Sequence, residues 1–108
     1  MQRIHKNKIN GIPDSLTEKL IELIIVHKPV KKIVVYGSRA TDNYRKTSGI
    51  DIAIVDENWS HSDISLVHFN LEEELPTPLT IDLVNHYDVS KQSMKDVINK
   101  GIVLYESN

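Results

Sequence analysis

The sequence predicts an α/β (α+β) domain in which a mixed sheet of three to four strands is flanked by helices. Two observations carry this prediction. Short β-branched runs alternate along the chain with segments whose apolar residues recur at the spacing of an amphipathic helix. The chain also has 108 residues, near the commonest size of one domain, and no linker or internal repeat divides it. We therefore expect one domain over residues 1–108.

Three helices are expected between the strands. The first should run from about residue 15 to His27, because Ser15 and Glu18 have the spacing of a capping box and apolar residues follow at helical intervals. The second, from Asp63 to Leu75, ends at a proline-rich breaker. The third should span residues 90–100.

Four segments have the composition of strands, since they are rich in β-branched residues and bounded by turn residues. In the second of them, Ile50, Ile52 and Ile54 alternate with less apolar positions, which is the two-residue period of a strand. The predicted strands cover residues 32–36, 50–55, 79–84 and 102–105.

Composition excludes several classes of protein. A net charge of −2 disfavours general nucleic-acid binding. Without cysteine the chain has neither a disulfide framework nor a thiolate zinc site. The N-terminal segment lacks the apolar core of a signal peptide, and no apolar stretch is long enough to span a membrane. We expect a cytoplasmic protein. The five histidines have no spacing that favours a metal site.

Candidate binding residues gather where predicted strands begin or end. Gly37 and Ser38 follow the first strand, where a missing side chain lets a ligand approach the backbone, although an ordinary turn has the same composition. Asp51 and Asp82 each stand inside an apolar strand, where a carboxylate is costly to bury unless it is paired or binds a metal. A salt bridge or a solvated strand end is the alternative for each.

The segment from Gly37 to Ile54 resembles the signature of minimal nucleotidyltransferases of the DNA polymerase beta superfamily. That signature contains Gly-Ser-Arg-Ala, a later arginine, Ser-Asp-x-Asp at the start of the second strand, and a third aspartate on a later strand. The residues of this chain that fall into those places are Gly37, Ser38, Arg39, Ala40, Arg45, Ser48, Asp51 and Asp82. The resemblance covers nearly the whole chain.

The resemblance implies a role for each matched residue. Asp51 and Asp82 would hold Mg²⁺ and, with Ser38, form the catalytic set. Gly37 and Ser38 would cradle the phosphates of ATP, with Ser48 also in the nucleotide site. Arg39 and Arg45 would neutralise phosphate charge.

One departure from the family pattern bears on catalysis. Gly49 stands where the signature has the first aspartate of the Asp-x-Asp pair, which normally bridges two metal ions. Asp42, which replaces a frequent glycine, and Asp56 are candidate substitutes, but neither occupies the matching strand position. A weakened or single-metal site is expected.

The resemblance also implies what the protein does. The resemblance implies transfer of a nucleoside monophosphate, AMP in particular, to a hydroxyl of a partner protein, as the antitoxin of a small helical HEPN toxin. Gly49 favours the alternative of an inactive binding module for protein or nucleotide. A homo-oligomer is also compatible with the sequence. Modification of a small molecule would require a second substrate-binding domain, which the sequence does not show.

Overall fold

A computed structural model describes residues 2–4 and 7–107 and contains a five-stranded mixed sheet. The strand order is β1-β5-β2-β3-β4, with β3 and β4 parallel and the other neighbouring pairs antiparallel. The strands are β1 (Gln2–Ile4), β2 (Lys32–Tyr36), β3 (Ile50–Val55), β4 (Ile81–Asn85) and β5 (Ile102–Ser107). The predicted mixed sheet is confirmed. Edge strand β1 was not predicted, because three residues carry too little pattern.

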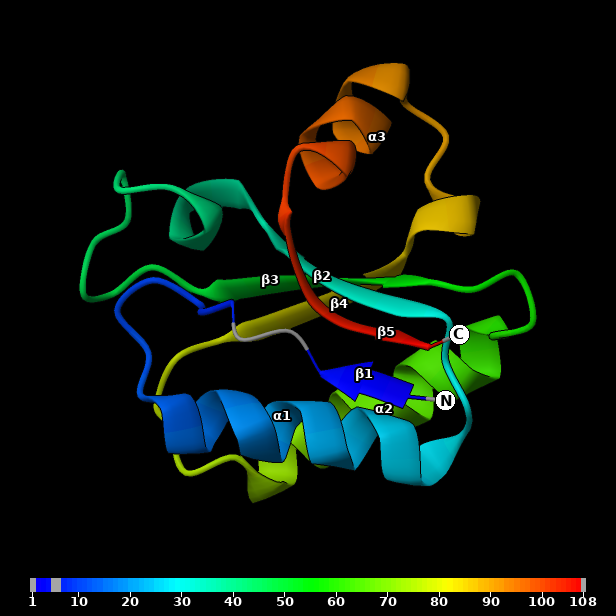
Figure 1. The fold of residues 1–108 in the computed structure, drawn as a ribbon, viewed down its shortest axis with the longest axis horizontal. Helices are drawn as coiled ribbons and strands as arrows, with labels where there is room; N and C mark the ends of the chain where they lie inside the picture. The colour runs from blue at the N-terminus through cyan, green and yellow to red at the C-terminus, as the bar shows by residue number, and fades with distance from the viewer. Residues whose placement is uncertain (1, 5–6, 108) are drawn as a thin grey trace.

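Helices cover both faces of the sheet (Figure 1). The helices are α1 (Asp14–His27), α2 (His61–Glu74) and α3 (Gln92–Asn99), with short 3₁₀ helices η1 (Gly37–Ala40) and η2 (His86–Asp88). Helices α1 and α2 lie together on one face, and α3 lies on the opposite face. All three predicted helices are confirmed, with their ends shifted by one or two residues.

The apolar residues divide into two layers that match these faces. The larger layer packs α1 and α2 against the sheet and includes Leu20, Ile24 and Leu71. The smaller layer lies under α3 and contains Val34, Tyr36, Ala53 and Ile98. Because successive strand residues point to opposite faces, Ile52 and Ile54 enter the first layer while Ala53 enters the second.

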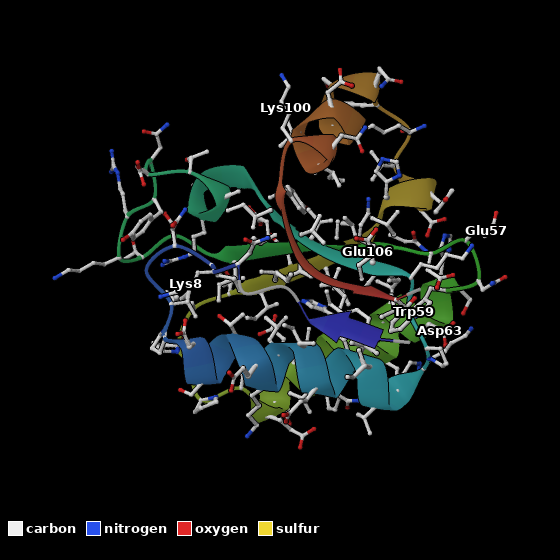
Figure 2. The ribbon with its side chains drawn as sticks, viewed as in Figure 1. Lys8, Glu57, Trp59, Asp63, Lys100 and Glu106 are labelled. Carbon is white, nitrogen blue, oxygen red and sulfur yellow. The ribbon has the colours of Figure 1, made fainter. Side chains whose placement is uncertain are left out.

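The predicted capping box of the first helix is wrong. Helix α1 begins at Asp14 after Pro13, and no side chain caps it. A capping box forms instead at α2, where the Ser60 side chain accepts from the Asp63 backbone and the Asp63 side chain accepts from Ser60. Asp63 also binds the end of α1, with Oδ1 3.0 Å from His27 Nε2. Figure 2 shows Asp63 beside the end of α1.

Within the part of the chain that the structure describes, no helix is long and apolar enough to span a membrane.

Candidate active site

Asp51 and Asp82 face each other across the parallel pair of strands. They are direct partners in the register of β3 and β4, and Tyr36 is the partner of Asp51 on the other side. Ala53 and Val84 are also partners and belong to the layer under α3, so both aspartates emerge on the α3 face of the sheet. The alternation predicted from the sequence is confirmed, and the two carboxyl groups meet.

The two carboxyl groups hydrogen-bond to each other, and this contact has an electrostatic consequence. Burial, the hydrogen bond to Asp82 and the charge of Asp82 raise the pKa of Asp51 from the usual 3.8 to about 6. Burial and the charges of both aspartates raise the pKa of the Tyr36 hydroxyl to about 12. The pair therefore repels itself when both groups are ionised, and a bound cation would relieve that repulsion.

Gly37 brings the turn after β2 into contact with the carboxylates. Its φ is +75°, which favours glycine, and a Cβ at this position would lie 2.6 Å from Oδ2 of Asp51. The half-buried Ser38 follows in η1, where its backbone oxygen accepts from Thr41 N at 3.2 Å and from Thr41 Oγ1 at 3.0 Å. The turn thus lies directly against Asp51.

Arg39 is buried, with only 2% of its surface exposed. Its guanidinium donates only to backbone carbonyls: Nε to Ser48 at 2.9 Å, Nη1 to Asn10 at 2.9 Å, and Nη2 to Arg45 and Lys46 at 3.2 and 3.3 Å. It also lies 5.1 Å from the ring centre of Tyr44. This geometry makes Arg39 an organiser of the loop before β3, because four of its five N–H donors are used by backbone carbonyls.

Arg45 and Ser48 belong to that loop. The Ser48 hydroxyl accepts from the Arg45 backbone at 2.8 Å, and the Ser48 backbone donates to the Arg45 carbonyl at 2.9 Å. Ser48 therefore closes a turn. The Arg45 side chain is exposed and forms no ion pair with a described residue, so it is the arginine of the signature that is available to a ligand.

Gly49 directly precedes β3, and a neighbouring side chain occupies the space beside it. A Cβ at position 49 would lie 2.6 Å from Thr80 Oγ1 and 3.2 Å from the Thr80 carbonyl oxygen, which already accepts from Ile50 N at 2.9 Å. Sequence reasoning did not find Thr80 or Tyr36 as site residues. The only sequence signals were that Tyr36 precedes Gly37 and that Thr80 lies two positions before Asp82.

Neither candidate substitute for the missing aspartate joins the pair. The Asp56 carboxylate is buried at the other end of β3, where it accepts from the backbones of Lys31 and Asn58 at 3.0 and 2.9 Å. Asp42 is exposed on the loop. Among the residues described, no group of three or more His, Cys, Asp and Glu is placed to hold a metal.

The carboxylate pair fits one magnesium ion. Magnesium in nucleotide sites is commonly held by one or two carboxylates, with phosphate oxygens and water completing its ligands. Asp51 and Asp82 supply that number of carboxylates. Among the described residues, no third carboxylate lies beside the pair, since position 49 is glycine.

Comparison with solved structures shows the same fold in several crystal structures, among them the following three. The crystal structure of a toxin-antitoxin with AMP-PNP has a TM-score of 0.70, 22% identity, and coverage of 85% of this chain and 74% of that chain. The crystal structure of the toxin-antitoxin MntA-HepT has a TM-score of 0.66 and 21% identity, with coverage of 88% of this chain and 74% of that chain. The structure of a putative nucleotidyltransferase from Sulfolobus solfataricus has a TM-score of 0.54 and 18% identity, with coverage of 82% of this chain and 76% of that chain.

A search of curated proteins found no significant match. The family model described as "Polymerase beta, Nucleotidyltransferase" matches residues 18–108, a span that contains the Gly37 turn, β3, β4 and both aspartates. Because this match covers most of the chain, the protein belongs to the polymerase beta nucleotidyltransferase family.

Proposed function

We propose that the protein binds magnesium and a nucleoside triphosphate, ATP in the first instance, and transfers its nucleoside monophosphate to a hydroxyl group of a partner protein. The observation that carries this proposal is the contact between Asp51, Asp82 and the Gly37 turn. Family membership and the fold shared with a protein crystallised with AMP-PNP support it.

Asp51 and Asp82 would hold the cation, which when bound neutralises negative charge on the phosphate oxygens. Gly37 lets the backbone of the turn lie directly against Asp51, and Ser38 follows it, so the phosphate oxygens of a nucleotide on that cation would meet this turn. In the transfer, the acceptor oxygen bonds to the α-phosphorus as the bond from that phosphorus to pyrophosphate breaks. The hydroxyl proton passes to a carboxylate of the pair. We assign phosphate contact to Arg45 and place Arg39 outside it.

The proposed partner is a small helical toxin of the HEPN type. Two of the similar structures described above are toxin-antitoxin structures, one of them MntA-HepT, which supports an antitoxin role for this chain. Affinity purification from the native host should recover one small protein in a fixed ratio. Recovery of this chain alone, at native abundance, would contradict the antitoxin role.

A second function, binding without catalysis, is favoured by the structure around Gly49. The side chain of Thr80 fills the space where the family's first aspartate would begin. Without that carboxylate, the chain retains a place for one cation and a nucleotide but lacks a ligand used in the chemical step.

Restoring the missing carboxylate discriminates between the two functions. We would compare the starting protein with Gly49→Asp and with Gly49→Asp/Thr80→Ala, since the second substitution removes the hydroxyl that a new side chain would contact. The assay is magnesium-dependent transfer of radiolabel from α-labelled ATP to the purified partner. A gain of about 4 kcal/mol in transition-state stabilisation corresponds to roughly a thousandfold in rate, so the double variant should transfer label far faster.

Added to Gly49→Asp/Thr80→Ala, the substitution Asp51→Asn should abolish transfer. Asp42→Asn in the same background removes one carboxylate charge from the exposed loop and should leave transfer intact. Equal and robust transfer by the starting protein and the double variant would show that Gly49 is not at the metal site. Absence of transfer from every variant, with nucleotide binding intact, would favour the binding module.

A further inference from the structure

A large open cavity lies outside the site of Asp51 and Asp82. Its volume is about 730 Å³, and three segments far apart in the sequence form its walls: residues 11–19 at the start of α1, the loop before β3, and residues 76–79 before β4. These segments lie together at one end of the molecule, beside the first turn of α1 (Figure 1).

The walls are largely apolar and are held in place by local structure. Ile12, Leu16 and Leu79 line the cavity. Pro76 and Pro78 restrict the backbone of their segment, and the Thr77 hydroxyl accepts from Leu79 N at 3.2 Å. Such a cavity is therefore preformed.

The aromatic wall depends on two neighbours. The Tyr44 ring lines the cavity and lies against the Arg39 guanidinium. Gly11, with φ +78°, makes this possible, because a Cβ there would lie 2.4 Å from Tyr44 Cε2 and 2.8 Å from Arg39 Nη1. The ring is thus fixed at the cavity wall.

The charge of the cavity is opposite to that of the whole chain. Lys19, Lys46 and Arg39 line it, and none of the described lining residues is acidic, although the chain carries a net charge of −2. Neither lysine forms an ion pair with a described residue, and both are exposed. Arg39 donates only to neutral carbonyls, so its charge is not compensated by an acid. An anion is the ligand that this arrangement favours.

The cavity is separate from the carboxylate site. Its lining contains neither Gly37, Ser38 nor either aspartate. Leu16 and Leu79 pack against the apolar layer of α1 and α2, whereas Asp51 and Asp82 emerge on the α3 face of the sheet. A ligand in the cavity would therefore lie on the other side of the sheet from the carboxylate pair.

We propose that this cavity binds a small organic anion with an aromatic or aliphatic body, at a site distinct from that of the nucleotide. The apolar walls and the Tyr44 ring take the body, and Lys19 and Lys46 take the negative charge. This assignment does not depend on the proposed transferase function.

The probe is 8-anilinonaphthalene-1-sulfonate, which combines a sulfonate with two aromatic groups and fluoresces when it leaves water. We expect saturable binding that weakens at least tenfold in Lys19→Gln/Lys46→Gln. The uncharged N-phenyl-1-naphthylamine, which lacks the sulfonate, should bind the starting protein and the variant equally. Lys100→Gln is the matched control, because Lys100 lies beyond α3, far from α1 (Figure 2), and should leave sulfonate binding unchanged.

Two results would overturn the proposal. The first is unchanged sulfonate binding in the double lysine variant, together with its loss in Leu66→Ser/Phe69→Ser, which would place the probe on the exposed apolar residues of α2. The second is competitive displacement of the probe by magnesium and ATP, which would make the cavity part of the nucleotide site. Circular dichroism of each variant controls for folding.

Discussion

The burial of Asp51 and its repulsion with Asp82 predict that removing the Asp51 charge stabilises the metal-free protein. Asp51→Asn keeps the size and shape of the side chain but removes its charge. The rise in the pKa of Asp51 from 3.8 to about 6 means that the fold disfavours the ionised group. For a group shielded from water, such a difference corresponds to about 3 kcal/mol. Because Asp51 is only partly buried, we expect solvent screening to reduce the gain to about 1 kcal/mol.

The stability gained by Asp51→Asn should increase as pH rises. The folded protein retains the Asp51 proton up to about pH 6, whereas the unfolded chain releases it near pH 3.8. The native state therefore binds more protons within this window, and its stability falls as pH rises through it. Below about pH 4 the starting protein and Asp51→Asn should be equally stable, and above about pH 6 the difference should be complete.

Thermal unfolding at pH 8 without magnesium measures this difference in stability. The Tm of Asp51→Asn should be about 4 °C above that of the starting protein. Asp42→Asn should leave Tm unchanged, because its carboxylate is exposed on the loop. Magnesium should reverse the order. At ten times a dissociation constant it stabilises the starting protein by about 1.4 kcal/mol and should have little effect on Asp51→Asn. A lower Tm for Asp51→Asn at pH 8, or a difference independent of pH, would refute the reasoning.

Two further predictions concern the turn and the buried arginine. Gly37→Ala should destabilise the fold by about 1–2 kcal/mol and weaken ATP binding in calorimetry, because φ is +75° and the new Cβ would contact Asp51. Unchanged ATP affinity would place the nucleotide elsewhere. Arg39→Lys should cost about 3 kcal/mol in urea unfolding, since a single ammonium cannot reach the four carbonyls. A loss of less than about 0.5 kcal/mol in the free energy of unfolding would show that the loop does not need these four hydrogen bonds.

The sequence predicted the central strands well because their signal is local. Residues 32–36 form a β-branched run that ends at a glycine, and the observed β2 has the same bounds. The predicted strand 79–84 is shifted to Ile81–Asn85, because the Leu79 backbone is used in a turn that the Thr77 hydroxyl stabilises. Such side-chain contacts have no periodicity to detect.

The meeting of Asp51 and Asp82 was only partly predictable. Alternation assigns each aspartate to a face of its own strand, but the distance between them depends on the register of two strands separated by a helix. The sequence also does not distinguish a surface arginine from a buried one. The place of Arg39 in the signature predicts phosphate contact, whereas its partners are the carbonyls of residues 10, 45, 46 and 48, which only the folded loop brings together.

The absence of an aspartate at position 49 is accompanied by a change in packing, because Thr80 occupies the space that a side chain there would need. The Thr80 carbonyl fixes the start of β3 through its bond from Ile50 N, and its hydroxyl lies 2.6 Å from where a side chain at position 49 would begin. An aspartate at position 49 would therefore require Thr80 to rotate away. Because Thr80 is exposed, that rotation meets little resistance, whereas the carbonyl contact at 3.2 Å requires a small backbone shift. The present packing thus suits two carboxylates, and a third one at position 49 requires movement of the Thr80 side chain and a small shift of the backbone.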